Sequence, residues 1–126
     1  MKYIFGFFAV LAVILPLQAQ AADPSVGRAQ FTTAILDREP VDNVSTIDAS
    51  SSRIQFFTEL LGMDGKTVTH RWKHGADVIA EITFNVRGPR WRVYSSKELL
   101  PEWTGEFSVE VVDDAGTVYG TYTLTR

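Results

Sequence analysis

The feature that most constrains this chain is the spacing of its apolar residues. From residue 29 onward they recur at every second position, with glycine or aspartate interrupting the pattern about every 8 to 12 residues. Such alternation is typical of strands with one buried face, so the sequence predicts an all-β domain. Seven strands are expected, at residues 29–36, 53–60, 67–73, 77–86, 90–95, 106–112 and 117–125.

Short strands separated by regular turns favour an immunoglobulin-like antiparallel β-sandwich of about seven strands, with a small closed β-barrel as the alternative. Residues 37–52 are polar and predict a long connection with a short edge segment near 44–47. The only helical signal, at residues 96–100, precedes Pro101 and predicts a single turn at most.

Two predicted hairpins allow a register to be proposed. A four-residue turn at 113–116 would place Val111 opposite Val118, and a three-residue loop at 74–76 would place Trp72 opposite Val78. The link at 87–90 fits a tight turn poorly because of Pro89, so it is expected to cross between the sheets.

The first 21 residues have the pattern of a cleavable signal peptide. Lys2 precedes an apolar run at residues 3–17, and Ala19-Gln20-Ala21 forms a small-x-small cleavage site. We therefore expect residues 22–126 to be a single periplasmic or secreted domain with no membrane span once the leader is removed. Retention of the leader as an anchor is the alternative.

Charge and composition argue against several classes of function. The chain has no cysteine and a formal net charge of −3, so disulfides are excluded and nucleic acid is not an expected partner.

His70 and His74 would lie about 13 Å apart along a strand, too far to be neighbouring ligands of one metal ion. His70 shares the inward face of its strand with Trp72 and is expected in the core. The sequence offers no nucleophile motif and no paired acids in a cleft, so we expect no enzyme, no catalytic residue, no metal and no cofactor.

Residues 87–97 concentrate basic side chains around a predicted strand. Alternation places Arg90, Arg92 and Tyr94 on its outward face and Trp91 on its inward face, with the core. Two guanidinium groups beside an aromatic ring could hold a carboxylate or phosphate of a partner. The structural alternative is cross-strand pairing of these arginines with Glu81 or Glu110.

We therefore expect a non-catalytic cell-envelope module that binds a protein partner. Its expected contact surface comprises outward-facing Arg90, Arg92 and Lys97, with Tyr94 and Trp103. The alternative is a module that binds cell-envelope glycans through exposed aromatic residues, mainly Trp103 and Tyr94.

Two further expectations concern residues 53–60. Phe56 and Phe57 point to opposite faces, so one of them could contribute to an exposed apolar surface. Glu59 is expected to meet Arg71 on the next strand.

Several blocks of the sequence resemble the bacterial domain-of-unknown-function family 2914. They are Phe31-x-x-x-Ile35-x-x-Arg38-Glu39-Pro40-Val41-Asp42, Phe57-Thr58-Glu59-Leu60, Val68-Thr69-His70-Arg71-Trp72, Gly88-Pro89-Arg90-Trp91-Arg92-Val93 with Ser95-Ser96-Lys97, and Pro101-Glu102-Trp103-x-Gly105. The resemblance extends over essentially all of residues 22–126. It implies an exported or membrane-tethered bacterial module and assigns no activity.

Overall fold

The computed structural model describes residues 23–126. The predicted signal peptide, residues 1–21, lies outside these residues. In the described part there is no helix long and apolar enough to cross a membrane.

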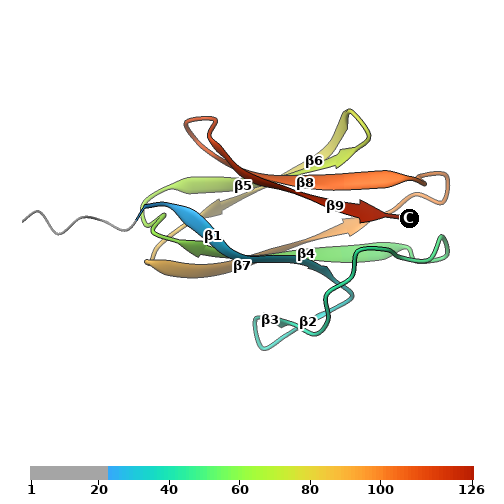
Figure 1. Cartoon of the computed structure of the whole chain (residues 1–126), viewed down its shortest axis with the longest axis horizontal. Helices are drawn as coiled ribbons and strands as arrows, with labels where there is room; N and C mark the ends of the chain where they lie inside the picture. The colour runs from blue at the N-terminus through green and yellow to red at the C-terminus, as the bar shows by residue number, and fades with distance from the viewer. Residues whose placement is uncertain (1–22) are drawn as a thin grey trace, which may run out of the picture.

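The chain forms a sandwich of two antiparallel sheets, with a small hairpin outside them (Figure 1). The elements are β1 (Ser25–Thr32), β2 (Ile35–Leu36), β3 (Glu39–Pro40), β4 (Arg53–Leu61), β5 (Thr67–His74), β6 (Asp77–Asn85), β7 (Arg90–Glu98), β8 (Glu106–Asp113) and β9 (Val118–Thr125). One sheet has the order β1-β4-β7 and the other the order β6-β5-β8-β9, while β2 pairs only with β3. The predicted all-β sandwich with seven long strands is confirmed.

The link after β6 crosses from one sheet to the other, as Pro89 had indicated. The single helical turn expected at residues 96–100 is wrong, because β7 continues to Glu98. The edge segment near residues 44–47 forms two isolated bridges, Phe31 with Val44 and Thr46 with Thr125.

Both predicted hairpin registers are wrong by two residues. Val111 pairs with Gly120 and Trp72 pairs with Ala80. A β-bulge beside each turn leaves an extra residue, Ile79 or Tyr119, on the second strand. Because a shift of two preserves the alternation, the faces of these strands were predicted correctly.

Aromatic residues from both sheets meet at the centre of the core. The ring of Phe56 lies 4.8 Å from that of Phe31 within its own sheet, and 5.0 Å and 5.4 Å from those of His70 and Tyr122 in the other. Trp72 is fully buried, as predicted, whereas Trp91 is only partly buried against the core.

His70 lies in this core and is completely buried. Its Nδ1 is 2.7 Å from Ser95 Oγ, its Nε2 is 2.8 Å from Thr58 Oγ1, and Trp72 Nε1 donates to Ser95 Oγ at 3.0 Å. When the Ser95 hydroxyl donates to Nδ1 and accepts from Trp72, neutral His70 carries its proton on Nε2 and donates it to Thr58. In the other tautomer Nδ1 donates to Ser95 and Nε2 accepts from the Thr58 hydroxyl, so both ring nitrogens have a partner in either form. The predicted core position of His70 is confirmed.

Burial of His70 makes the stability of the domain depend on pH. Desolvation lowers the pKa of this imidazole to about 3, whereas in an unfolded chain it is about 6.5. Between these values the unfolded chain binds a proton that the folded protein does not. The free energy of unfolding should therefore fall as the pH drops below 6.5, by up to about 1.4 kcal/mol per pH unit.

Urea denaturation at pH 7.5 to 5 tests this expectation in a range above the ordinary pKa of carboxylates. His70→Gln should abolish the decrease and His74→Gln should retain it. An equal decrease in both variants, or an NMR titration of His70 near pH 6.5 in the folded protein, would contradict the assignment.

Candidate functional site

Charged side chains form a network on the outer face of the three-stranded sheet. Glu59 on β4 pairs in register with Arg28 on β1 and with Arg92 on β7, so alternation directs all three side chains to this face. Glu59 Oε2 lies 3.1 Å from Arg28 Nη2 and 2.7 Å from Arg90 Nη2. Glu59 is thus a nearly buried carboxylate, its side chain 11% exposed, between two guanidinium groups.

The β2–β3 hairpin adds a second carboxylate to this network. Glu39 Oε2 lies 2.8 Å from Arg28 Nη1, and Glu39 Oε1 also accepts a hydrogen bond from Arg92. The hairpin is anchored to the end of β1 by Asp42, whose carboxylate accepts hydrogen bonds from the hydroxyls of Thr32 and Thr33 and from the backbone N–H of Thr33. Figure 1 shows β2 and β3 lying outside the sheet that contains β4 and β7.

Phe57 lies on this same outer face and is nevertheless fully buried. The guanidinium of Arg28 lies over its ring, 5.0 Å from the centroid, and Tyr94 is its partner on β7. Phe56 is buried on the opposite face of the strand. The prediction that one of these two residues contributes to an exposed apolar surface is therefore wrong.

The turn of the hairpin is strained. Asp37 and Arg38 have φ values of 51° and 62°, and they are the two non-glycine residues with positive φ among residues 23–126. A two-residue turn with both residues in this region normally uses asparagine and glycine, because a side chain there clashes with the backbone. The chain therefore presents the Arg38 side chain at a position where glycine would be less strained.

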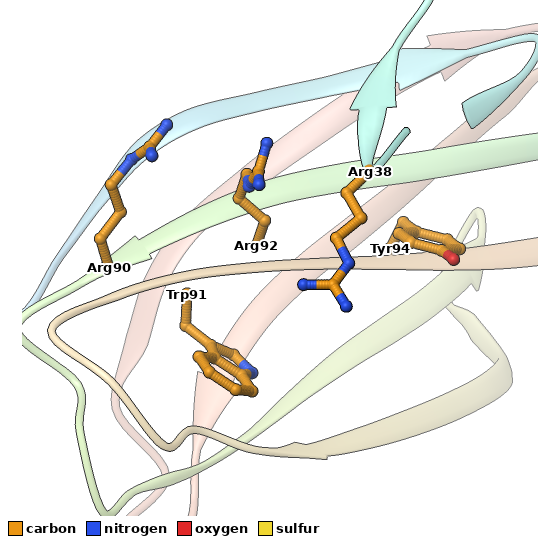
Figure 2. A pocket seen from close by; sticks show the side chains of 5 residues that line it. All are labelled: Arg38, Arg90, Trp91, Arg92 and Tyr94. Atoms are coloured by element: carbon orange, nitrogen blue, oxygen red, sulfur yellow. The ribbon is translucent and has the colours of Figure 1, made fainter. Parts of the chain in front are cut away.

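Arg38 reaches a shallow pocket beside β7. The pocket has a volume of about 280 Å³ and is lined by Arg38, Arg90, Trp91, Arg92 and Tyr94. Figure 2 shows the Arg38 side chain crossing β7, with its guanidinium between the side chains of Trp91 and Tyr94. Arg38 forms no ion pair with any group in the described part of the chain, and Tyr94 is 46% exposed.

Both glutamates of the network are ionised at neutral pH. Burial alone would raise the pKa of Glu59, but hydrogen bonds from Arg28 and Arg90 outweigh it and hold this pKa below its ordinary value. Hydrogen bonds from Arg28 and then Arg92 lower the pKa of Glu39 to about 2. The network and the pocket together contain four arginines (Arg28, Arg38, Arg90 and Arg92) against these two carboxylates, which leaves an excess of positive charge.

The predicted contact surface is brought together only in part. Arg90, Arg92 and Tyr94 line the pocket, whereas Lys97 and Trp103 do not. The expectation that Lys97 faces outward with the arginines is wrong, because it has the parity of buried Val93 and Ser95 on β7. Its ammonium lies 5.6 Å from the centroid of the Trp103 ring, which packs against the core.

The predicted ion-pair partners are also wrong. Arg90 and Arg92 pair with Glu59 and Glu39, not with Glu81 or Glu110. Arg71 pairs with Glu81 and Glu110 on its own sheet, so it does not meet Glu59. These errors share one cause, which is that strand order within the sheets cannot be read from alternation.

Sequence reasoning did not identify Arg38 or Trp91 as pocket residues. Arg38 lies within residues 37–52, which the sequence predicts to be a polar connection. The hairpin that holds it has only two residue pairs, Ile35 with Pro40 and Leu36 with Glu39. Within residues 23–126 no group of three or more His, Asp or Glu side chains could hold a metal ion. His74 Nε2 lies 2.7 Å from the backbone oxygen of Thr104.

A family model described as "Protein of unknown function (DUF2914)" matches residues 65–125, which include β5 to β9 and four of the five pocket residues. No curated protein matches the chain. The blocks of resemblance at residues 31–42 and 57–60 lie outside the matched segment.

Glu59 should contribute more to stability than an exposed glutamate does. Glu59→Gln leaves Arg28 and Arg90 without their shared carboxylate, and we expect the free energy of unfolding to fall by about 2 kcal/mol. Glu81→Gln, which breaks an exposed pair with Arg71, should cost less than about 0.5 kcal/mol. Urea denaturation measures both, and equal losses would mean that the network does not support the sheet.

Proposed function

We propose that this chain, which matches the DUF2914 family of proteins of unknown function over residues 65–125, is a non-catalytic interaction module that binds carboxylate groups of a protein partner. The observation that carries this proposal is the positive excess at the pocket. Arg90 and Arg92 are held in place by Glu59 and Glu39, and Arg38 has no carboxylate of its own among the described residues. A carboxylate entering the pocket would meet guanidinium donors and the half-exposed ring of Tyr94.

The strained turn supports the same proposal. Non-glycine residues in the left-handed region persist where the side chain has a use that offsets the strain, and such positions cluster at binding sites. Arg38 is held there by a hairpin fixed at Asp42 and Glu39, so its guanidinium reaches the pocket with restricted freedom. Restricting the side chain in advance reduces the entropy lost when a partner binds.

We place the module in the bacterial cell envelope, in the periplasm or outside the cell. The support for this location is the signal-peptide pattern of residues 1–21. The glycan alternative has weaker support, because its two aromatic residues lie on different faces: Tyr94 points outward from β7, while Trp103 lies under the inward-facing Lys97.

Replacing Arg38 should separate binding from stability. Arg38→Gly relieves the strained turn, so the free energy of unfolding should stay equal or rise by about 1 kcal/mol. Loss of the guanidinium should weaken binding of a blocked peptide of alternating glutamate and threonine by about 10-fold at low salt.

Isothermal titration calorimetry measures the peptide affinity of each variant. Arg71→Ala removes one positive charge from the other sheet and should leave the affinity unchanged. Unaltered binding by Arg38→Gly would remove Arg38 from the site, and no binding by the wild type would reject the carboxylate proposal. A neutral chitin oligosaccharide serves as the probe for the glycan alternative.

The location is tested by expressing the full chain in a Gram-negative bacterium. We expect the protein in the periplasmic fraction or the medium, with a mass that corresponds to a first residue of Ala22. Replacing Ala19 and Ala21 with bulky residues should block processing. Accumulation of the uncut wild type in the cytoplasm would contradict the proposed location.

A further inference from the structure

The free edge of β7 is the feature of the fold that the proposed pocket leaves unexplained. β7 is the last strand of its sheet and, within residues 23–126, pairs only with β4. The C-terminal ends of β1 and β9 are bridged by the segment at 44–47, where Val44 N donates to Phe31 O, Ile47 N to Thr125 O and Thr125 N to Ser45 O. Within residues 23–126 no such segment bridges the outer edge of β7.

The other edge strands, β1, β6 and β9, are poorer templates for another strand. The pairing of each is irregular, between Val26 and Arg28 in β1, at Ile79 in β6 and at Tyr119 in β9, and bulges disrupt edge pairing. β7 pairs with β4 over nine consecutive residues without any irregularity, so it presents a straight, regular edge. The pocket also lies beside β7, on residues from the same strand.

The register of the sheet determines which backbone groups of β7 point outward. Leu99 N donates to Ser52 O at 2.8 Å and Gly62 N donates to Pro89 O at 2.9 Å, one at each end of the ladder. In an antiparallel ladder such pairs recur at every second residue, so the odd-numbered residues of β7 bond to β4. The N–H and C=O groups of the even-numbered residues, Arg90, Arg92, Tyr94 and Ser96, therefore point away from β4 to the free edge.

Three of these residues are also the pocket residues Arg90, Arg92 and Tyr94. The same short segment thus offers unpaired backbone groups along its edge and cationic side chains on its outer face. A strand added at this edge would place alternate side chains on that face, about 7 Å apart, which is the spacing between Arg90 and Arg92.

We infer that the partner binds as an added β-strand along β7, through an extended acidic segment with carboxylates at alternate positions. This inference rests on the proposed function and specifies the conformation in which the partner is recognised. Charge complementarity selects the occupant. A second copy of β7 would bring three further cations, Arg90, Arg92 and Lys97, and a single carboxylate, Glu98, so it would add to the positive excess at this edge and not neutralise it.

Backbone methylation of the partner tests the inference. The probe is a blocked seven-residue peptide of alternating glutamate and threonine, titrated into the purified protein in three forms: unmodified, N-methylated at the glutamates, or N-methylated at the threonines. Only one alternating set of peptide N–H groups can face β7, the glutamate set if the strand adds antiparallel and the threonine set if it adds parallel. We expect one methylated peptide to lose at least 10-fold in affinity and the other to keep the affinity of the unmodified peptide.

Hydrogen exchange supplies an independent readout on the protein. Binding of the unmodified peptide should slow exchange of the amides of Arg92 and Tyr94, whereas that of Val93, already bonded to β4, should change little. Arg38→Gly should weaken all peptide forms without changing which methylated set fails.

The outcomes separate the two proposals. Equal affinities for all three peptides, or equal losses with both methylated forms, overturn strand addition and leave carboxylate binding standing. Absence of binding by the unmodified peptide rejects the proposed function itself. Concentration-dependent dimerisation that protects the amides of Arg92 and Tyr94 without peptide would assign the edge to a second copy and overturn the inference.

Discussion

The hydrogen bonds between the two sheets at His70 fix the arrangement on which the rest of the structure depends. His70 and Trp72 come from the four-stranded sheet, while Thr58 and Ser95 come from the three-stranded one. These bonds lie in a dry core, where an unpaired donor or acceptor costs about 1 to 3 kcal/mol. Sliding β7 by one residue so that Tyr94 takes the place of Ser95 would bring its large ring into the core and leave His70 Nδ1 and Trp72 Nε1 without the Ser95 hydroxyl. The core therefore sets which residues of β7 face outward, and with them the position of the arginines.

The glutamates of the outer face complete this arrangement. Glu59 is directed outward by the same alternation that directs Thr58 inward, and it holds Arg28 and Arg90. Glu39 extends the network to the hairpin, where the apolar residue Leu36 is 66% exposed and adds little contact with the sheet. The pocket thus forms where the hairpin, held by the ion pairs of Glu39, lies on the regular sheet.

This division explains how much could be predicted from the sequence. Alternation identified the sandwich, the core positions of His70 and Trp72, and the outward faces of Arg90, Arg92 and Tyr94, because each follows from the period of a single strand. The registers of the hairpins could not be predicted, since the bulges at Ile79 and Tyr119 have no pattern of their own. Arg38 could not be found either, because its place beside Tyr94 depends on ion pairs between segments more than fifty residues apart, such as Glu39 with Arg92. Lys97 was misassigned when a regular strand was expected to end three residues early.

The hairpin and the sandwich are held by different forces, and they should therefore respond differently to the solvent. Salt screens the charge pairs that fix the hairpin, whereas burial of the aromatic core is insensitive to screening and is strengthened by sulfate or phosphate salts. Raising the ionic strength would loosen the wall of the pocket that carries Arg38 while the two sheets stay intact. The salt concentration of the surrounding medium would then determine how rigidly Arg38 is positioned at the pocket, while the fold of the two sheets stays unchanged.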